Sequence, residues 1–287
     1  MNCPKHKKYA GLVKPKGDCD VCQLIWENTI LKRSVDEFSK KTIAEQKIVL
    51  GKTITIGALG DTQLGSLYDR VDLLQEAYKT FRKLGVSEVY HTGDLVDGNG
   101  RMYRGQEYEL RTHGADRQVE YAILHYPHIA GITTHFITGN HDLSFYKQTG
   151  LDVGLMIADK RKDMIYLGKE EADVSFSFGP HKIIVRLSHP GKGTAYAISY
   201  NSQKYIESLS GGKKPHIVLT GHFHKSEFLP NYRNVALIQT GCLQEQTPFM
   251  RRQNIAAMMG FWVIEFGANE GGLSMLKGQF FPFYEGV

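Results

Sequence analysis

Five short segments of the chain carry side chains that can bind divalent metal ions. Carboxylate, amide and imidazole groups of this kind suit hard to borderline divalent cations. The segments are Asp-Thr-Gln at 61–63, Gly-Asp-Leu-Val-Asp at 93–97, Gly-Asn-His-Asp at 139–142, Ser-His-Pro-Gly at 188–191 and Gly-His-Phe-His at 221–224. One such segment alone is weak evidence, because Gly-Asp is a common turn. Five in succession predict a metal site.

Each of these segments directly follows a predicted β-strand. Alternating apolar and β-branched runs predict strands at 53–59, 88–92, 134–138, 182–188 and 216–220. Helical spacing of apolar residues predicts helices over 70–84 and 116–126. Further strands are predicted at 235–240, 261–266 and 274–279. Strands that alternate with helices indicate an α/β layered fold. In such sheets, ligands bind at the carboxyl ends of the strands.

In this order the segments resemble the signature of the calcineurin-like metallophosphoesterase superfamily. That signature reads D-x-H, G-D-x-x-D, G-N-H-D/E, a single histidine and G-H-x-H. The resemblance covers about residues 51–224. It implies a layered β-sandwich flanked by helices, with two metal ions at one end.

The resemblance also implies a role for each matching residue. The implied ligands are Asp61, Gln63, Asp94 and His224 for one metal, and Asp94, Asn140, His189 and His222 for the other. Asp94 would bridge the two ions. His141 would be the general acid, and Asp142 would orient it. Asp97 would support the site from outside the ligand set, or would be a plain loop carboxylate.

The implied chemistry is hydrolysis of a phosphate ester. Two divalent ions about 4 Å apart ionise a shared water near neutral pH, and the resulting bridging hydroxide attacks phosphorus in line. The same ions neutralise charge on the phosphoryl oxygens. A histidine can protonate the leaving oxygen near pH 7.

Gln63 departs from the signature, which has histidine at that position. An amide oxygen is neutral and hard, so it should favour manganese or magnesium, with iron and zinc as alternatives. A weakened first metal site, with one metal or none, is the other interpretation. The remaining ligands and their supporting residues can compensate for one weak ligand.

The N-terminus carries a second group of metal-competent side chains. Cys3 and His6 form C-x2-H, and Cys19 and Cys22 form C-x2-C twelve residues later. This spacing predicts a structural zinc site, and unconnected thiols are the alternative. Five of the first sixteen residues are lysines and none is acidic. Such a basic module is expected to dock nucleic acid or a protein partner.

The expected organisation is a zinc-ribbon-like module at 1–24, a linker helix at 25–48 and a metallophosphoesterase domain at 49–287. The helix is predicted from apolar spacing and from a capping box at 34–37. The chain has no apolar run long enough for a membrane span. The apolar stretch of a secretory signal is also missing after Met1, so a cytoplasmic location is expected.

Residues 98–108 follow the second segment and overhang the predicted site. Arg101, Tyr103 and Arg104 could grip phosphate and stack on bases, or they could belong to a solvated loop. Protein Ser/Thr phosphatases of the superfamily have G-D-x-x-D-R-G here, whereas this chain has Asp97-Gly98-Asn99. We therefore expect a phosphodiesterase or nuclease, similar to the DNA-repair nuclease branch. The alternatives are a phosphomonoesterase acting on a nucleotide or phosphoprotein, and a non-catalytic scaffold.

Overall fold

The computed structural model describes residues 6, 15, 17, 19–27, 43–99, 107–191, 193, 195–212 and 214–284. The chain divides into two compact units, Met1–Thr42 and Ile43–Val287. In the first unit, residues 20–27 form a helix that buries Cys22 and Ile25. The second unit contains the predicted metal ligands.

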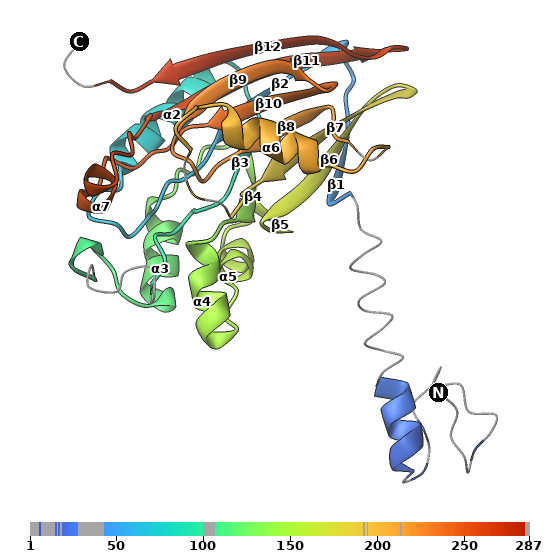
Figure 1. Cartoon of the computed structure of the whole chain (residues 1–287), viewed down its shortest axis with the longest axis vertical. Coiled ribbons are helices and arrows are strands. Elements are labelled where there is room, and N and C mark those ends of the chain that lie inside the picture. Colours follow the sequence, from blue (N-terminus) through green and yellow to red (C-terminus); the bar gives the residue numbers. More distant parts are fainter. Residues whose placement is uncertain are drawn as a thin grey trace. The chain divides into compact units, whose positions relative to one another are not determined.

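The second unit is built around two six-stranded sheets (Figure 1). The first sheet has the order β1 (Glu45–Ile48), β6 (Glu171–Phe178), β7 (His181–Ser188), β8 (Ile217–Thr220), β10 (Val235–Thr240) and β9 (Ser226–Tyr232). Strands β7, β8 and β10 are parallel neighbours. Their carboxyl ends therefore lie at one edge of the first sheet.

The second sheet has the same parallel character at its centre. Its order is β12 (Gly272–Pro282), β11 (Gly260–Asn269), β2 (Thr53–Leu59), β3 (Glu88–His91), β4 (Thr133–Thr138) and β5 (Met164–Lys169). Strands β2 to β5 are parallel, and β11 pairs antiparallel with both β2 and β12. The loops that follow β2, β3 and β4 thus leave the sheet at the same edge.

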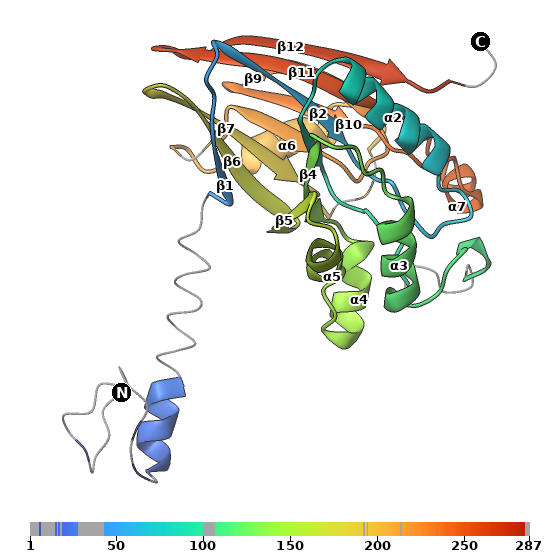
Figure 2. The same cartoon turned by 180° about the vertical axis from the view of Figure 1, so that it is seen from behind.

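The core lies between the two sheets and on the outer face of each. Ile56 and Ala58 of β2 pack between the sheets with Val185 of β7, whereas Leu59 faces the helices. This alternation follows from the two-residue period of a strand. Helices α2 (Val71–Lys83), α3 (Ala115–His125), α4 (Asp142–Thr149) and α5 (Val153–Lys160) lie on the side of the second sheet (Figure 2). Helix α6 (Tyr200–Ser208) packs on the first sheet through Ile206.

The expected fold is confirmed: the molecule has an α/β architecture in which helices flank a β-sandwich. Each predicted strand and both predicted amphipathic helices are present within a few residues of their expected bounds. The sequence did not indicate β5, β6, β9, α4, α5, α6 or α7 (Pro248–Arg252).

The predicted linker helix at 25–48 is wrong at its carboxyl end. Residues 45–48 form strand β1, which pairs in parallel with β6. Glu45 and Lys47 face the second sheet, where Lys47 contacts Glu88, and this tertiary pairing overrides local helix propensity. The compact second unit therefore begins at Ile43, before the expected boundary at 49. The capping box at 34–37 lies outside the described residues.

Within the described parts of the chain, no helix combines the length and apolar character needed to cross a lipid bilayer.

Candidate metal centre

The seven predicted ligands of the two-metal site come together at the carboxyl ends of the strands. They belong to the loops after β2 (Asp61, Gln63), β3 (Asp94), β4 (Asn140), β7 (His189) and β8 (His222, His224). A continuous set of contacts joins all seven, and both sheets contribute to it. Side chains that are far apart in sequence thus form one site.

Asp94 lies at the centre of the ligand set and is buried. Its Oδ2 lies 3.1 Å from His189 Nε2 and accepts a hydrogen bond of 3.1 Å from Gln63 Nε2. The ligand atoms of Asp94, His189 and His222 all lie within 4.8 Å of one another. Asp94 therefore faces both halves of the ligand set, as a bridging carboxylate must.

Asp61 occupies the other side of the site. Its two carboxylate oxygens accept hydrogen bonds of 3.0 and 2.9 Å from the backbone N–H of His222. His224 Nε2 lies 3.5 Å from Asp61 Oδ1. The ligands from β2 and from β8 are thereby held against each other.

Two buried ligand atoms have no hydrogen-bond partner, namely Gln63 Oε1 and His224 Nδ1. A buried polar atom that lacks a partner costs about 1–3 kcal/mol. A divalent cation would satisfy the Gln63 oxygen, and the mixture of oxygen and nitrogen donors suits such an ion. The residues present therefore fit the metal site that the sequence predicted.

The charges of the site also favour the binding of cations. Burial and the neighbouring Asp94 raise the pKa of Asp61 to about 8. Although burial opposes ionisation, His189 and His141 hold the pKa of Asp94 well below its usual range. Burial also opposes the charging of His189, but Asp94 and Asp61 raise its pKa to about 9. Buried carboxylates at this spacing compete for positive charge, and bound cations would supply it.

The imidazole of His189 is fixed in the orientation that a metal ligand needs. Its Nδ1 lies 2.8 Å from the carbonyl oxygen of Thr92. Because a carbonyl only accepts, Nδ1 carries the hydrogen. The other nitrogen, Nε2, then faces Asp94 and lies 2.9 Å from Asn140 Oδ1. Hydrogen bonds of this kind set the tautomer and direction of metal-binding histidines.

The ring of His141 is also oriented by a backbone carbonyl at Nδ1, but it is not buried among the ligands. Its Nδ1 donates to the carbonyl oxygen of Asp97 at 2.6 Å, and its Nε2 lies 3.9 Å from Asp94 Oδ2. The side chain is 22% exposed, whereas that of Asp94 is 1% exposed. His141 thus lies at the rim of the site, beside both the ligands and solvent.

Asp142 has a different task from the predicted one of orienting His141. Its carboxylate accepts hydrogen bonds from the backbone N–H groups of Leu95, Val96 and Gly139. It therefore ties the loop after β3 to the loop after β4. The hydrogen bond that fixes the His141 ring comes from the Asp97 carbonyl instead.

Asp97 is buried next to His141. Its Oδ1 lies 3.9 Å from His141 Nδ1 and accepts a hydrogen bond of 3.4 Å from Gln244 Nε2. Gln244, in the loop after β10, also donates to Ser66 Oγ. Sequence reasoning missed Gln244, because no motif or spacing marks it.

His91 is a second residue that sequence reasoning missed. It is buried at the end of β3, and its Nδ1 accepts a hydrogen bond from the backbone N–H of Gly93. Its Nε2 lies 3.1 Å from Thr62 Oγ1, which donates to the carbonyl of Leu95. Burial and the nearby His189 lower the pKa of His91 to about 3, so the ring is neutral. His91 joins the loops that carry Asp61, Gln63 and Asp94.

The backbone is unusual at five of the seven ligands. Asp61, Gln63, Asp94, His222 and His224 have φ values of 50°, 48°, 54°, 83° and 52°. Few residues other than glycine adopt positive φ, and such residues cluster at functional sites. The surrounding hydrogen bonds hold these residues in place.

Two glycines of the motifs leave room for the ligand carboxylates. A Cβ atom at Gly221 would lie 2.7 Å from Asp61 Oδ2, and one at Gly139 would collide with Asp94 Oδ1. Any larger residue would push a ligand out of place. The glycines in the sequence motifs therefore have a direct steric reason.

The other predicted site residues are partly described. Arg101, Tyr103, Arg104 and Cys3 lie outside the described residues. In the first unit, the ligand atoms of His6, Cys19 and Cys22 all lie within 4.8 Å of one another. Cys22 Sγ lies 3.2 Å from His6 Nδ1. Three of the four predicted zinc ligands thus come together.

Comparison with known proteins agrees with this geometry. The family model described as calcineurin-like phosphoesterase matches residues 54–226, more than half of the chain. A curated relative is the DNA polymerase II small subunit of Methanothermobacter thermautotrophicus, which is 27% identical over 208 residues. That match covers 58% of this chain and 40% of the relative, so the chain spans less than half of the relative's length.

Several solved structures are similar to this chain at lower sequence identity. GAP50, the anchor in the inner membrane complex of Plasmodium, is 11% identical with a TM-score of 0.45, over 80% of this chain and 84% of GAP50. The NAD nucleotidase of Haemophilus influenzae is 12% identical with a TM-score of 0.42, over 81% of this chain and 50% of the nucleotidase. A predicted phosphoesterase of Streptococcus pneumoniae is 12% identical with a TM-score of 0.37, over 79% of this chain and 98% of that protein.

Proposed function

Since the chain belongs to the calcineurin-like phosphoesterase family, we propose that it hydrolyses phosphodiester bonds of nucleic acid with two divalent metal ions. Members of this family bind two such ions. The observation that carries the proposal is the buried ligand set around Asp94, in which Gln63 Oε1 and His224 Nδ1 have no protein partner. Divalent cations would complete this set of oxygen and nitrogen donors.

We propose the two ligand sets that the family signature implies. Asp61, Gln63, Asp94 and His224 would hold one ion, and Asp94, Asn140, His189 and His222 would hold the other; the contacts that join these seven residues support the proposal. When bound, such ions activate water and neutralise charge on the phosphate. Manganese is the preferred ion, because Gln63 supplies a hard oxygen where the family signature has histidine.

The protein's own contribution to the reaction is proton transfer and positioning. His141 Nε2 lies beside Asp94 at the exposed rim, where a leaving oxygen can reach it. The Asp97 carbonyl holds Nδ1–H, so the ring keeps its direction while Nε2 delivers a proton. Asp142 and His91 hold the ligand loops together through backbone hydrogen bonds. General acid catalysis of this type contributes about 10²–10⁴-fold.

Nucleic acid is favoured as the substrate by two observations. The curated relative is a subunit of a DNA polymerase. The sequence has a net charge of +5, with five lysines in its first sixteen residues. A basic surface binds polyanions through their phosphates. We further propose that Cys3, His6, Cys19 and Cys22 bind one structural zinc ion, supported by the proximity of the last three.

Substitution of Asp94 tests the proposed function. Asp94→Asn should abolish Mn²⁺-dependent hydrolysis of bis(4-nitrophenyl) phosphate and release at least one metal ion, measured by elemental analysis. Both ions share this carboxylate, so both lose a charged ligand. Asp159→Asn, at an exposed position on α5, is the matched control. Two metals retained with full activity would remove the assignment.

The same assay separates the alternative functions. Faster hydrolysis of 4-nitrophenyl phosphate than of the diester would identify a phosphomonoesterase. Two bound metals without turnover of either ester would identify a binding subunit, a role favoured by the name of the curated relative. Zinc content of Cys19→Ser, compared with that of wild type, tests the N-terminal site independently.

A further inference from the structure

We propose that Tyr196 stacks against a nucleobase of the substrate strand, which makes residues 195–199 the part of the site that distinguishes nucleic acid from a simple diester. This inference rests on the proposed function. It assigns a substrate contact to a residue that belongs to none of the sequence motifs. In the sequence, Tyr196 lies between the ligand His189 and helix α6.

Tyr196 is fully exposed, which is unusual for a large aromatic side chain. Ile198, two residues on, and Tyr200, the first residue of α6, are also exposed, the latter by 53%. Aromatic rings ordinarily bury their faces, and exposed groups of apolar residues mark interaction sites. The ring of Tyr196 is therefore available to a ligand.

The backbone on both sides of Tyr196 is anchored to the metal centre and to the first sheet. Lys225, which directly follows the ligand His224, donates from Nζ to the carbonyl of Ala195 at 3.0 Å. Gln239 of β10 donates to the carbonyl of Ile198 at 3.2 Å. Asn201 of α6 donates to the carbonyl of Gly193 at 3.0 Å. The backbone at residues 193, 195 and 198 is thus fixed beside the ligands. The exposed ring of Tyr196 therefore projects from an anchored backbone.

A nucleic acid strand is the occupant that fits these features. A phosphodiester held at the metal centre places the neighbouring bases at the rim of the site. Every base offers a flat face, so an exposed tyrosine binds them with little sequence preference. The ammonium of Lys225, between the ligand loop and the tyrosine loop, adds positive charge along the path of the phosphates.

Exposed aromatic residues also occur next to other loops of the metal centre. Tyr108 and Phe249 are 60% and 43% exposed. Tyr108 adjoins the loop after Gln63, because Leu67 N donates to the carbonyl of Glu109. The loop before Phe249 contacts the loop of Asp61 through Leu243 N. Exposed aromatic side chains therefore lie next to several of the ligand loops, where the bases of a bound strand could contact them.

The test compares a strand that has bases with one that has none. Wild type, Tyr196→Ala and Tyr196→Phe are assayed with a short oligothymidylate and with an abasic oligonucleotide of equal length. Tyr196→Ala should raise KM for the oligothymidylate about tenfold, the usual effect of losing one stacking partner, with a much smaller effect on the abasic strand. Tyr196→Phe should stay within about twofold of wild type, since it keeps the ring.

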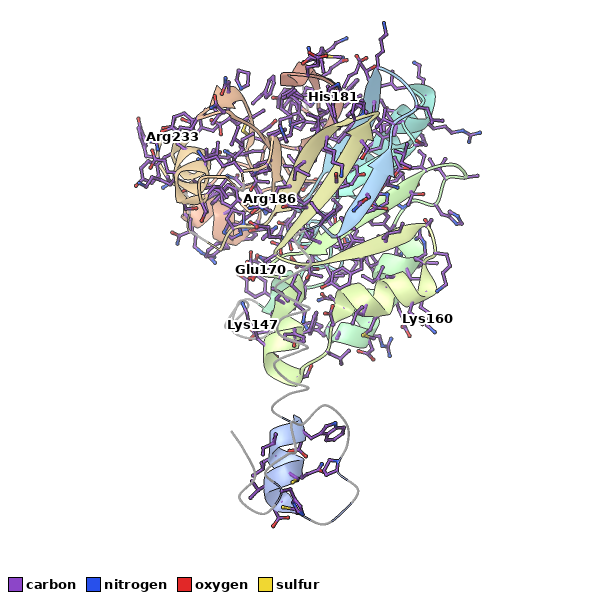
Figure 3. The ribbon with its side chains drawn as sticks, turned by 90° about the vertical axis from the view of Figure 1, so that its right-hand side faces the viewer. Lys147, Lys160, Glu170, His181, Arg186 and Arg233 are labelled. Atoms are coloured by element: carbon purple, nitrogen blue, oxygen red, sulfur yellow. The ribbon has the colours of Figure 1, made fainter. Side chains whose placement is uncertain are left out.

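His181→Ala is the control, because it removes a ring at the opposite end of β7 from His189. Figure 3 shows His181 and Glu170 at the two ends of the β6–β7 hairpin, and Glu170 is hydrogen-bonded to the backbone of His189. This variant should match wild type on both strands. An unchanged KM for Tyr196→Ala, or an equal rise on both strands, would overturn the inference.

The two proposals fail separately. If wild type does not hydrolyse bis(4-nitrophenyl) phosphate with Mn²⁺, the proposed catalytic function fails. Binding of the two strands, measured by fluorescence anisotropy, still tests Tyr196 in that case. If Tyr196→Ala weakens the binding of both strands equally, or weakens the binding of neither, stacking is excluded whatever the outcome for catalysis.

Discussion

At the residue scale, the ligands are held in backbone conformations that their side chains disfavour. A positive φ at a residue other than glycine costs on the order of 1–3 kcal/mol. Backbone hydrogen bonds offset that cost, among them Asp61 N to Gly93 O and Gln63 N to Asp94 O. The strained residues are therefore fixed by their neighbours. The protein's own hydrogen bonds thus help to hold the ligand set in place.

His141→Asn should separate proton donation from metal binding. The ring of His141 is oriented by the Asp97 carbonyl and reaches the rim of the site. We expect nearly unchanged metal content and a decrease in kcat of about 10²–10⁴-fold. Diesters with very good leaving groups should lose less, because they need no proton. Equal losses on good and poor leaving groups would contradict the general-acid role.

Gln63→His should change which metal the enzyme prefers. Gln63 Oε1 is buried without a protein partner, and Nε2 donates to Asp94. Imidazole nitrogen is a softer donor than amide oxygen, so affinity for zinc or iron should rise while wild type works best with manganese. Metal titrations of activity measure this shift. Gln148→His, an exposed change on α4, is the control, and identical titrations for Gln63→His and wild type would refute the assignment.

At the element scale, a half-buried cluster of charged residues joins β1 to the second sheet. His135 of β4 lies 2.8 Å from Glu45 of β1 through Nδ1, and 2.6 Å from Glu88 of β3 through Nε2. Lys47 Nζ lies 3.2 Å from Glu45 and 2.9 Å from Glu88. The ring stacks on Tyr90, with 5.0 Å between ring centroids. The cluster lies at the amino ends of β3 and β4, away from the metal ligands.

This cluster should make stability depend on pH through His135. Burial lowers the pKa of His135, but the ion pairs of its ring with Glu45 and Glu88 outweigh that effect and raise it. A raised pKa stabilises the folded state below the unfolded value of about 6.5, and this contribution is lost as pH rises through the folded value. The pKa values of Glu45 and Glu88 are lowered despite burial, so their contribution is lost on acidification.

His135→Gln should therefore flatten the pH profile. The free energy of unfolding of wild type, from urea denaturation, should decrease between about pH 6 and pH 9, and that of His135→Gln should decrease less. At about pH 6 the variant should be less stable by roughly 1–3 kcal/mol, because the carboxylates lose a partner. His181→Gln is the control. Parallel profiles for wild type and His135→Gln would contradict the prediction.

The same elements show what the sequence can and cannot predict. Loops such as Gly93-Asp94 and Gly139-Asn140-His141 were predictable, because β-branched runs end abruptly in polar motifs of fixed spacing. Strand β1 was not, since Glu45, Gln46 and Lys47 favour helices and the strand depends on pairing with β6. The orientation of His141 depends on a backbone carbonyl, which every residue has. Interactions that need distant backbone groups leave no mark on side-chain spacing.

At the scale of the whole molecule, the chain combines a unit that carries the phosphoesterase family match with an N-terminal unit rich in lysine. We expect the first unit to supply affinity for nucleic acid and the second to supply the chemistry. Each phosphate that a lysine neutralises should steepen log K against log[salt] by roughly 0.9 on duplex DNA or 0.7 on single strands. The five lysines of residues 1–16 are the groups concerned.

Removing residues 1–42 should weaken binding to nucleic acid. It should also reduce the slope of log K against log[salt] by about two to four units. Hydrolysis of bis(4-nitrophenyl) phosphate should stay within about twofold of the full chain, because the metal ligands belong to the second unit. Replacing the five lysines with glutamine in the full chain should flatten the slope in the same way. Equal affinity and slope in all three proteins would show that this unit does not contact nucleic acid.

The position of the cut matters, because β1 covers the edge of the first sheet. Residues 45–48 pair with β6, whose side chains are largely buried along its length. Without β1, β6 would present unpaired backbone groups beside an apolar strand, and exposed edges of that kind recruit other chains into intermolecular sheets. A chain that begins after residue 48 should therefore aggregate. Strand β1, with Glu45 and Lys47 on one face, would thus prevent aggregation by occupying the place beside β6 that a second molecule would otherwise take.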